Sequence, residues 1–213
     1  MNNVVKAIFW DNDGVLVETE HLYFMASRQI LASVDVTLTQ DQFVELFMIR
    51  RIGAWHLAEQ KGLSLGEIER LRTARNSLYS QLLRQERVCV EGVREVLDAL
   101  YGRYLMGVVT SSNRDHFELM HQSTGLVKYF DFVLAGGDYP RHKPDPAPYL
   151  LAVERSGFDR EECLAIEDSE RGLRSAHAAG IRCLVIPGKL TRGSDFSAAH
   201  KVLGSISEVL SEV

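Results

Sequence analysis

Five short runs of apolar residues stand out along the chain, and each of them ends in a polar group. The runs are almost continuously apolar, as expected for strands whose two faces are both buried in a parallel sheet. These predicted strands cover residues 4–11, 104–112, 130–138, 163–168 and 182–188. Patterns typical of helices lie before and between the later runs, at residues 91–102, 114–125, 146–157 and 169–180. The alternation of strand and helix predicts an α/β fold with a doubly wound parallel sheet.

Residues 18–87 break this rhythm, because they contain several helical stretches and no convincing strand. Two Ser/Thr residues have the capping-box spacing of a helix start, namely Thr39 with Gln42 and Ser64 with Glu67. Apolar residues recur along one stripe of a predicted long helix at Leu71, Ala74, Leu78 and Leu82. We therefore expect a helical cap insert at residues 18–87 and a core domain formed by residues 1–17 and 88–213.

The net charge and composition of the 213-residue chain narrow the classes of binding partner and the cellular locations to be expected. A formal net charge of −5 offers no basic surplus for a phosphate backbone, so we expect no nucleic-acid partner. No stretch is long and apolar enough to span a membrane, and the start of the chain has no basic leader, so we expect a cytoplasmic protein. Cys163 and Cys183 lie in apolar runs and are expected to be small reduced core residues. The sequence sets no expectation for the oligomeric state.

Candidate chemistry gathers where the predicted strands end. Ligands of an open parallel sheet bind outside the carboxyl ends of the strands. A group of carboxylates, hydroxyls and one ammonium follows these ends: Asp11, Asp13, Thr110, Ser111, Lys143, Glu167 and Asp168. Such a set suits a magnesium ion together with a phosphoryl group.

The spacing of the first two carboxylates gives each a distinct expected role. In an extended chain the side chains of Asp11 and Asp13 point to the same side, and Gly14 allows a tight turn after them. Asp11 is the candidate nucleophile, and Asp13 suits general acid and base work. Free N–H groups near Thr110 and Ser111, where a helix is expected to begin, would hold phosphate oxygens.

Four short segments of this chain resemble the motifs of the haloacid dehalogenase superfamily, in the same order. They are "DNDGV" at 11–15, "VVTSSN" at 108–113, "KPDP" at 143–146 and "IEDS" at 166–169. With a helical insert directly after the first motif, the chain looks like the C1-capped subfamily IA, which includes β-phosphoglucomutase and sugar-phosphate phosphatases. The resemblance covers nearly the whole chain.

The resemblance implies a role for each matching residue. Asp11 would be the nucleophile, Asp13 the acid and base, and Thr110 with Lys143 the pair that binds phosphate. Asp11, the carbonyl of Asp13, and Asp168 would be the ligands of Mg²⁺, with Glu167 in the outer shell of the metal. Further candidates for contact with substrate phosphate are Asn12, Ser111, Arg114 and Arg51.

Some positions depart from the family pattern or leave alternatives open. Asn12 stands where an apolar residue is usual, Trp10 where phenylalanine is common and Glu18 where aspartate is frequent. Arg51 and its neighbour Arg50 could bind a second anionic group or lie in solvent. The same two alternatives stay open for Arg114, which could simply begin a helix, and for His21.

The predicted activity is Mg²⁺-dependent hydrolysis of a small phosphate monoester, such as a sugar phosphate or phosphoglycolate, through an aspartyl-phosphate on Asp11. The alternative is an isomerase of the β-phosphoglucomutase type, which shares the core chemistry. Tyr23 aligns with a histidine that the mutases carry, which disfavours this alternative. A dehalogenase, which uses no magnesium and lacks a counterpart of Asp13, and a binding protein without turnover are weaker alternatives.

Overall fold

The computed structural model describes residues 4–50 and 52–213 of the chain. The chain forms two compact units, one made of Met1–Glu18 with Val88–Val213 and the other of Thr19–Arg87. The first unit holds the sheet, and the second is helical in its described part. No helix in residues 4–50 and 52–213 has the length and hydropathy needed to cross a membrane.

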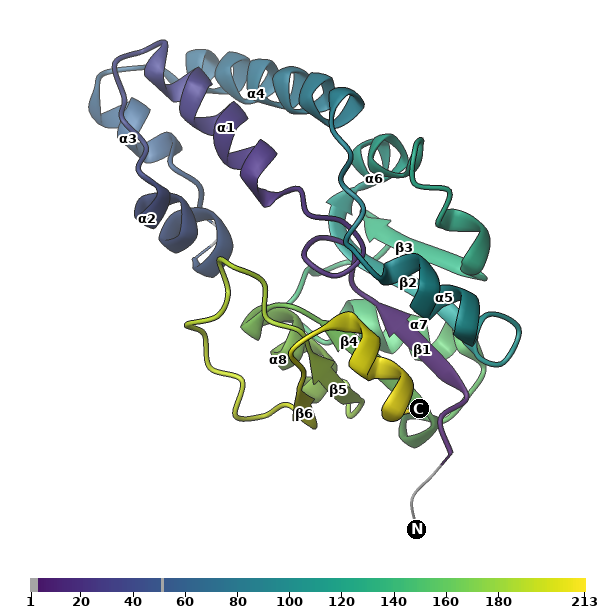
Figure 1. Ribbon diagram of the computed structural model, residues 1–213. Helices are drawn as coiled ribbons and strands as arrows, with labels where there is room; N and C mark the ends of the chain where they lie inside the picture. The colour runs from purple at the N-terminus through teal and green to yellow at the C-terminus, as the bar shows by residue number, and fades with distance from the viewer. Residues whose placement is uncertain (1–3, 51) are drawn as a thin grey trace. The chain divides into compact units, whose positions relative to one another are not determined.

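A six-stranded parallel sheet forms the centre of the first unit (Figure 1). Its strands run in the order β3-β2-β1-β4-β5-β6. Their bounds are β1 Ala7–Trp10, β2 Leu105–Asn113, β3 Phe132–Gly136, β4 Cys163–Glu167, β5 Arg182–Val185 and β6 Lys201–Val202. β1 lies in the middle, paired with β2 on one side and β4 on the other, so the residues that follow β1 are placed beside those that end β2 and β4.

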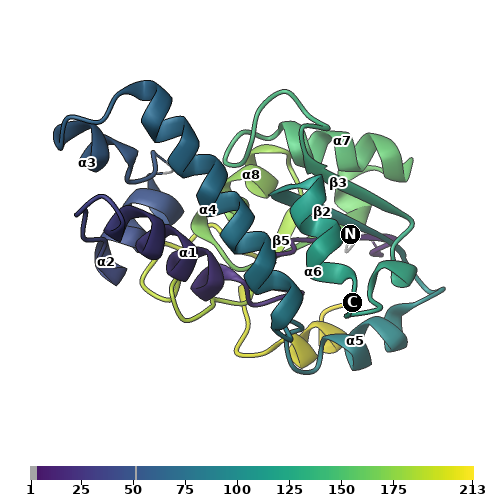
Figure 2. The ribbon, with the colours of Figure 1, turned by 90° about the horizontal axis from the view of Figure 1, so that it is seen from above.

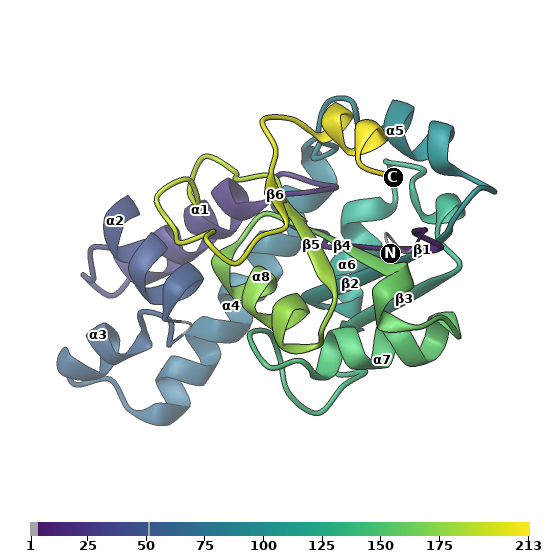
Figure 3. The same ribbon diagram turned by 90° about the horizontal axis from the view of Figure 1, so that it is seen from below.

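Helices cover both faces of this sheet, which confirms the predicted doubly wound α/β fold. The helices are α5 Val93–Leu100, α6 Arg114–His121, α7 Ala147–Ser156 and α8 Glu170–Ala178, with short 3₁₀ turns at Val127–Tyr129, Arg160–Glu162 and Ile206–Ser211. α7 and α8 pack on the face that carries Ala7, Phe9 and Ala165. Figure 3 shows α5 and the C-terminal turn on the opposite side of the sheet from α7.

The five predicted strands and four predicted helices of this unit are all present; β2 is shifted by one residue from its predicted bounds, and the other elements are shorter than predicted. The sixth strand, β6, and the C-terminal 3₁₀ turn were not predicted. β6 has only two residues, both exposed, and so carries no apolar run that a pattern could detect. Cys163 and Cys183 are buried and free, as expected for small core residues, and Cys89 is exposed and free.

The helical unit contains α1 Glu20–Ala32, α2 Gln40–Phe43, a π-helix at Val44–Ile49, α3 Trp55–Gln60 and α4 Leu65–Gln85. α1 and the long α4 lie side by side (Figures 1 and 2). Both predicted capping boxes are present, so Thr39 and Ser64 accept main-chain hydrogen bonds at the starts of α2 and α4. A side-chain oxygen at this position satisfies an N–H group that the helix itself cannot.

The predicted long helix is present as α4, but its apolar stripe is not its buried face. Leu71, Leu78 and Leu82 are half-buried and Ala74 is exposed. The buried residues are Ile68, Arg75, Tyr79 and Leu83. Arg75 is buried because its guanidinium lies 4.4 Å from the ring centroid of Tyr23 and 5.5 Å from that of Trp55. Aromatic faces attract a cation, and hydropathy alone gives no sign of this.

Candidate active site

The turn after β1 brings the first aspartates to the carboxyl end of the sheet. The main-chain carbonyl of Asn12 accepts hydrogen bonds from the N–H groups of Val15, Leu16 and Val17, which folds the chain back on itself. Gly14 has a φ of +85°, and a Cβ atom there would clash with the carboxylate of Asp168. Glycine at this position therefore allows both the turn and the close approach of β4's end.

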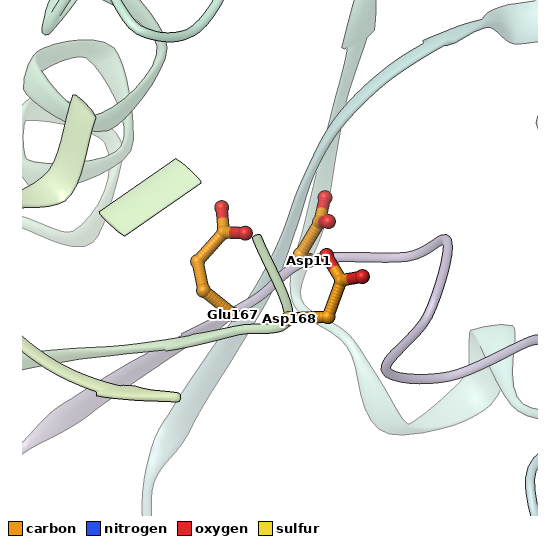
Figure 4. A group of neighbouring side chains, drawn as sticks. All are labelled: Asp11, Glu167 and Asp168. Carbon is orange, nitrogen blue, oxygen red and sulfur yellow. The ribbon is translucent and has the colours of Figure 1, made fainter. Parts of the chain in front are cut away.

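Asp11, Glu167 and Asp168 form a buried acidic cluster (Figure 4). One carboxylate oxygen from each lies within 4.8 Å of the others. Asp11 follows β1, whereas Glu167 and Asp168 come from the end of the neighbouring strand β4. Oxygen ligands at this spacing fit a hard cation such as Mg²⁺.

Lys143 is the cation that the structure itself supplies to this cluster. Its Nζ lies 2.8 Å from Oδ1 of Asp11, 2.6 Å from Oε1 of Glu167 and 2.7 Å from the carbonyl oxygen of Val109. The side chain of Lys143 is only 1% exposed, so these interactions are strongly shielded from water. Burial disfavours the ammonium, but the charges of Asp11 and Glu167 outweigh burial and raise the pKa of Lys143.

The electrostatics of the cluster favour a further cation. The pKa of Asp11 is raised from 3.8 to about 7, chiefly by burial and next by the charge on Glu167, while Lys143 opposes both. Glu167 is already held by Lys143 and by the hydroxyl of Tyr149, which donates to its Oε1 at 2.6 Å. That Asp11, Asp13 and Asp168 hold a metal stays a prediction from the sequence, and the buried cluster contains two of these residues.

Asp13 lies in a separate group of hydrogen bonds. Its Oδ2 accepts from Ser112 Oγ at 2.7 Å and from Thr110 Oγ1 at 3.4 Å. Thr110 also accepts the N–H of Ser112 at 3.0 Å. The predicted neighbours Asp13 and Thr110 thus meet, and the end of β2 orients the carboxylate of Asp13.

The other residues predicted to contact substrate differ in their burial and in their bonding partners. The hydroxyl of Ser111 is buried and has no hydrogen-bond partner among the described residues. Arg114 begins α6 and forms an ion pair with Asp138 at 2.5 Å, so its side chain is held by the protein. Arg50 lies exposed in the helical unit, as does His21. Arg51 lies outside the described residues.

The side chain of Asn12 points into the core, where it contacts His121 at 2.7 Å and Met120 at 3.1 Å. Any contact of Asn12 with a phosphate would therefore come from its main chain. Sequence reasoning missed His121, Ser112 and Tyr149. Ser112 belongs to the quoted "VVTSSN" segment, which was a usable signal, whereas His121 and Tyr149 lie within helices whose patterns mark them only as part of a packed face.

The raised pKa of Asp11 predicts how stability depends on pH in the absence of divalent cations. The folded state binds this proton more tightly than the unfolded chain, so the contribution of Asp11 to stability is greatest below pH 3.8 and is lost as pH rises toward 7. Asparagine resembles the protonated form. We expect the Tm of Asp11→Asn to match that of the parent near pH 4, and to exceed it near pH 8 by about 2–4 °C for each kcal/mol of stability gained. Thermal unfolding of both proteins in EDTA measures this, and an equal difference at both pH values would contradict it.

A parallel sheet that carries an acidic cluster, a buried lysine and a second aspartate at the carboxyl ends of its strands defines the chain as an α/β enzyme of the hydrolase type. Comparison with protein families gives the same result: residues 8–186 match the model of the haloacid dehalogenase-like hydrolases. The chain belongs to this family.

Relatives of known name and a solved structure are similar over most of the chain. Protein CbbY of Cereibacter sphaeroides is 30% identical over 97% of this chain and 94% of its own length. The phosphorylated carbohydrates phosphatase of Thermotoga maritima is 32% identical over 83% of this chain and 82% of its own. A crystal structure of mutant CbbY from Rhodobacter sphaeroides in complex with xylulose 1,5-bisphosphate is 26% identical, with a TM-score of 0.83 and coverage of 96% of each chain.

Proposed function

We propose that this chain is a Mg²⁺-dependent phosphatase that hydrolyses a small phosphate monoester, most readily a sugar phosphate. The observation that carries the proposal is the pairing of buried Asp11 with Lys143, 2.8 Å apart, beside a second aspartate held by Ser112 and Thr110. The relatives support the substrate class, because one is named as a phosphatase of phosphorylated carbohydrates and another was crystallised with a sugar bisphosphate.

In the proposed reaction, a carboxylate oxygen of Asp11 attacks phosphorus and forms an aspartyl-phosphate while the bond to the leaving oxygen breaks. Asp13 donates a proton to that oxygen. Asp13 then takes a proton from the water molecule that attacks the phosphoryl group, which releases phosphate and restores Asp11. Lys143 lowers the pKa of Asp11, which favours the ionised nucleophile, and offsets the negative charge at the site.

Asp11, Asp168 and the main-chain carbonyl of Asp13 would hold the magnesium ion. When bound, the ion supplies positive charge that neutralises the phosphoryl oxygens. Thr110 and Ser111 are the proposed contacts for these oxygens, with the buried Ser111 hydroxyl as a donor that no described residue uses. The helical unit is proposed to act as the substrate-selecting cap, the substrate as a small phosphorylated metabolite, and the location as cytoplasmic.

The test is phosphate release from a panel of sugar phosphates, phosphoglycolate, nucleotides and p-nitrophenyl phosphate, with Mg²⁺ or with EDTA. We expect release that requires Mg²⁺ and is fastest with one of the sugar phosphates. Release that is equal in EDTA would contradict the metal. Conversion of β-glucose 1-phosphate in the presence of a bisphosphate primer, without net phosphate release, would establish the isomerase instead.

A further inference from the structure

A buried chain of hydrogen bonds connects α6 to the carboxylate of Asp13. Thr124 Oγ1 lies 2.8 Å from Nδ1 of His121, and Nε2 of the same ring lies 2.7 Å from Oδ1 of Asn12. The amide nitrogen Nδ2 of Asn12 then donates to Oδ2 of Asp13 at 3.3 Å. Asn12, His121 and Thr124 are at most 5% exposed, so the links between these three residues are closed to bulk water, while the link from Asn12 to Asp13 is partly buried.

The chemistry of the four groups fixes the direction of this chain. Oδ1 of Asn12 can only accept, so Nε2 of His121 carries the proton, and the neutral ring then accepts at Nδ1 from the hydroxyl of Thr124. Nδ2 of Asn12 faces the acceptors Asp13 Oδ2 and Met120 Sδ, so a flipped amide would place its oxygen against the carboxylate. Burial lowers the pKa of His121 to about 4, although the charge of Asp13 opposes this, and the ring stays neutral at physiological pH.

We propose that His121 is a positioning residue, which acts through Asn12 to hold the carboxylate of Asp13 in the orientation that protonates the leaving group. This inference rests on the proposed function, in which Asp13 is the general acid. Hydrogen bonds from Asn12, Thr110 and Ser112 all end on Oδ2 of Asp13. Three side chains therefore fix the position of this one oxygen, and with it the orientation of the carboxylate of Asp13.

Asn12 shapes the site in two ways, through its main chain and through its side chain. Its main-chain carbonyl closes the turn that follows β1, and its side chain reaches Asp13. A buried amide and a buried imidazole each cost free energy unless they are hydrogen-bonded, and an apolar pair of similar volume would fill the same space without that cost. The pair is therefore better explained by the orientation that it imposes than by packing alone.

The experiment compares kcat/KM for substrates whose leaving groups differ in their need for a proton. The substrates are the best sugar phosphate, phenyl phosphate, whose leaving group has a pKa near that of tyrosine at about 10, and p-nitrophenyl phosphate, whose leaving group is more acidic. kcat/KM reports only the steps up to phosphoryl transfer to Asp11, so breakdown of the aspartyl-phosphate does not enter. We expect His121→Phe to lower kcat/KM by about 10- to 100-fold for the sugar phosphate but by less than about 2-fold for p-nitrophenyl phosphate.

Two further variants separate positioning from loss of folding. In His121→Gln the amide N–H₂ can still donate to Asn12, so most of the activity should return. Thr124→Val removes only the hydroxyl that fixes the imidazole of His121. We expect a smaller loss of kcat/KM than in His121→Phe, again largest for the sugar phosphate and smallest for p-nitrophenyl phosphate. Ser156→Ala is the control, because it removes another buried hydroxyl, at the far end of α7, that bonds to the carbonyl of Val153.

Each outcome bears on the inference. An equal loss for all three substrates in His121→Phe and Thr124→Val, with no return in His121→Gln, would show that the chain serves stability only and would overturn the assignment. A parent that releases no phosphate from any substrate would reject the proposed function and this inference together. A loss that grows with the basicity of the leaving group, with Ser156→Ala unchanged, would support it.

Discussion

Asp11→Asn is expected to lower phosphate release by at least about 10⁴-fold, which is the scale on which removal of a nucleophile acts in enzymes that work through a covalent intermediate. Asparagine has nearly the same shape and keeps an oxygen for Lys143, but its amide is a very poor nucleophile towards phosphorus. The carboxylate of Asp11 lies beside both Lys143 and the proposed metal ligand Asp168, whereas Glu167 in the same cluster is already bonded to Lys143 and Tyr149. Release of phosphate from the best substrate in Mg²⁺ measures the effect.

A matched control and a second readout make this result specific. Glu154→Gln changes an exposed acid near the C-terminal end of α7, away from the residues of the site, and should leave the activity unchanged. After brief reaction with substrate and acid quenching, the parent should carry an acid-stable phosphoryl group and Asp11→Asn should carry none. Loss of a catalytic nucleophile lowers activity by far more than about 10-fold. If Asp11→Asn retained activity within that range of the parent, another group would have to attack phosphorus.

The sheet could be predicted from the sequence because its strands are buried on both faces. β1, β2 and β4 are near-continuous apolar runs that end abruptly in polar residues, and this contrast also marks where ligands bind. β6 has two exposed residues and is recognisable only from its pairing with β5. Patterns of hydropathy therefore identify elements that build the core and miss elements that are held by hydrogen bonds alone.

The partners of the site residues could not be predicted in the same way. The strand ends place Asp11 and Asp168 together, but the contact between Asn12 and His121 joins residues 109 positions apart and depends on how α6 packs. Likewise, the burial of Arg75 on α4 follows from aromatic rings on α1 and α3. Such polar contacts between elements are decided by tertiary packing, which a single sequence does not display.

Lys143→Met is expected to have the largest effect on stability. Methionine fills a similar volume but leaves the carboxylates of Asp11 and Glu167 buried without their counter-charge. Removal of one partner from a buried ion pair destabilises a protein by about 3–5 kcal/mol. At about 2–4 °C per kcal/mol for a chain of this size, the Tm should fall by roughly 10 °C. Thermal unfolding at neutral pH in EDTA measures this without a contribution from bound metal.

Lys201→Met is the matched control, because Lys201 lies as close to its partner Glu212, at 2.6 Å, as Lys143 does to Glu167. The side chains differ in exposure, which is 52% for Lys201 and 1% for Lys143. Water and salt screen the exposed pair, so its loss should change the Tm little. An equal fall in Tm in the two variants would contradict this prediction, because the fall in Tm would then not depend on the burial of Asp11 and Glu167. A large loss in Lys143→Met alone would show that the same lysine that balances the charge of Asp11 for catalysis also makes the buried cluster compatible with a stable fold.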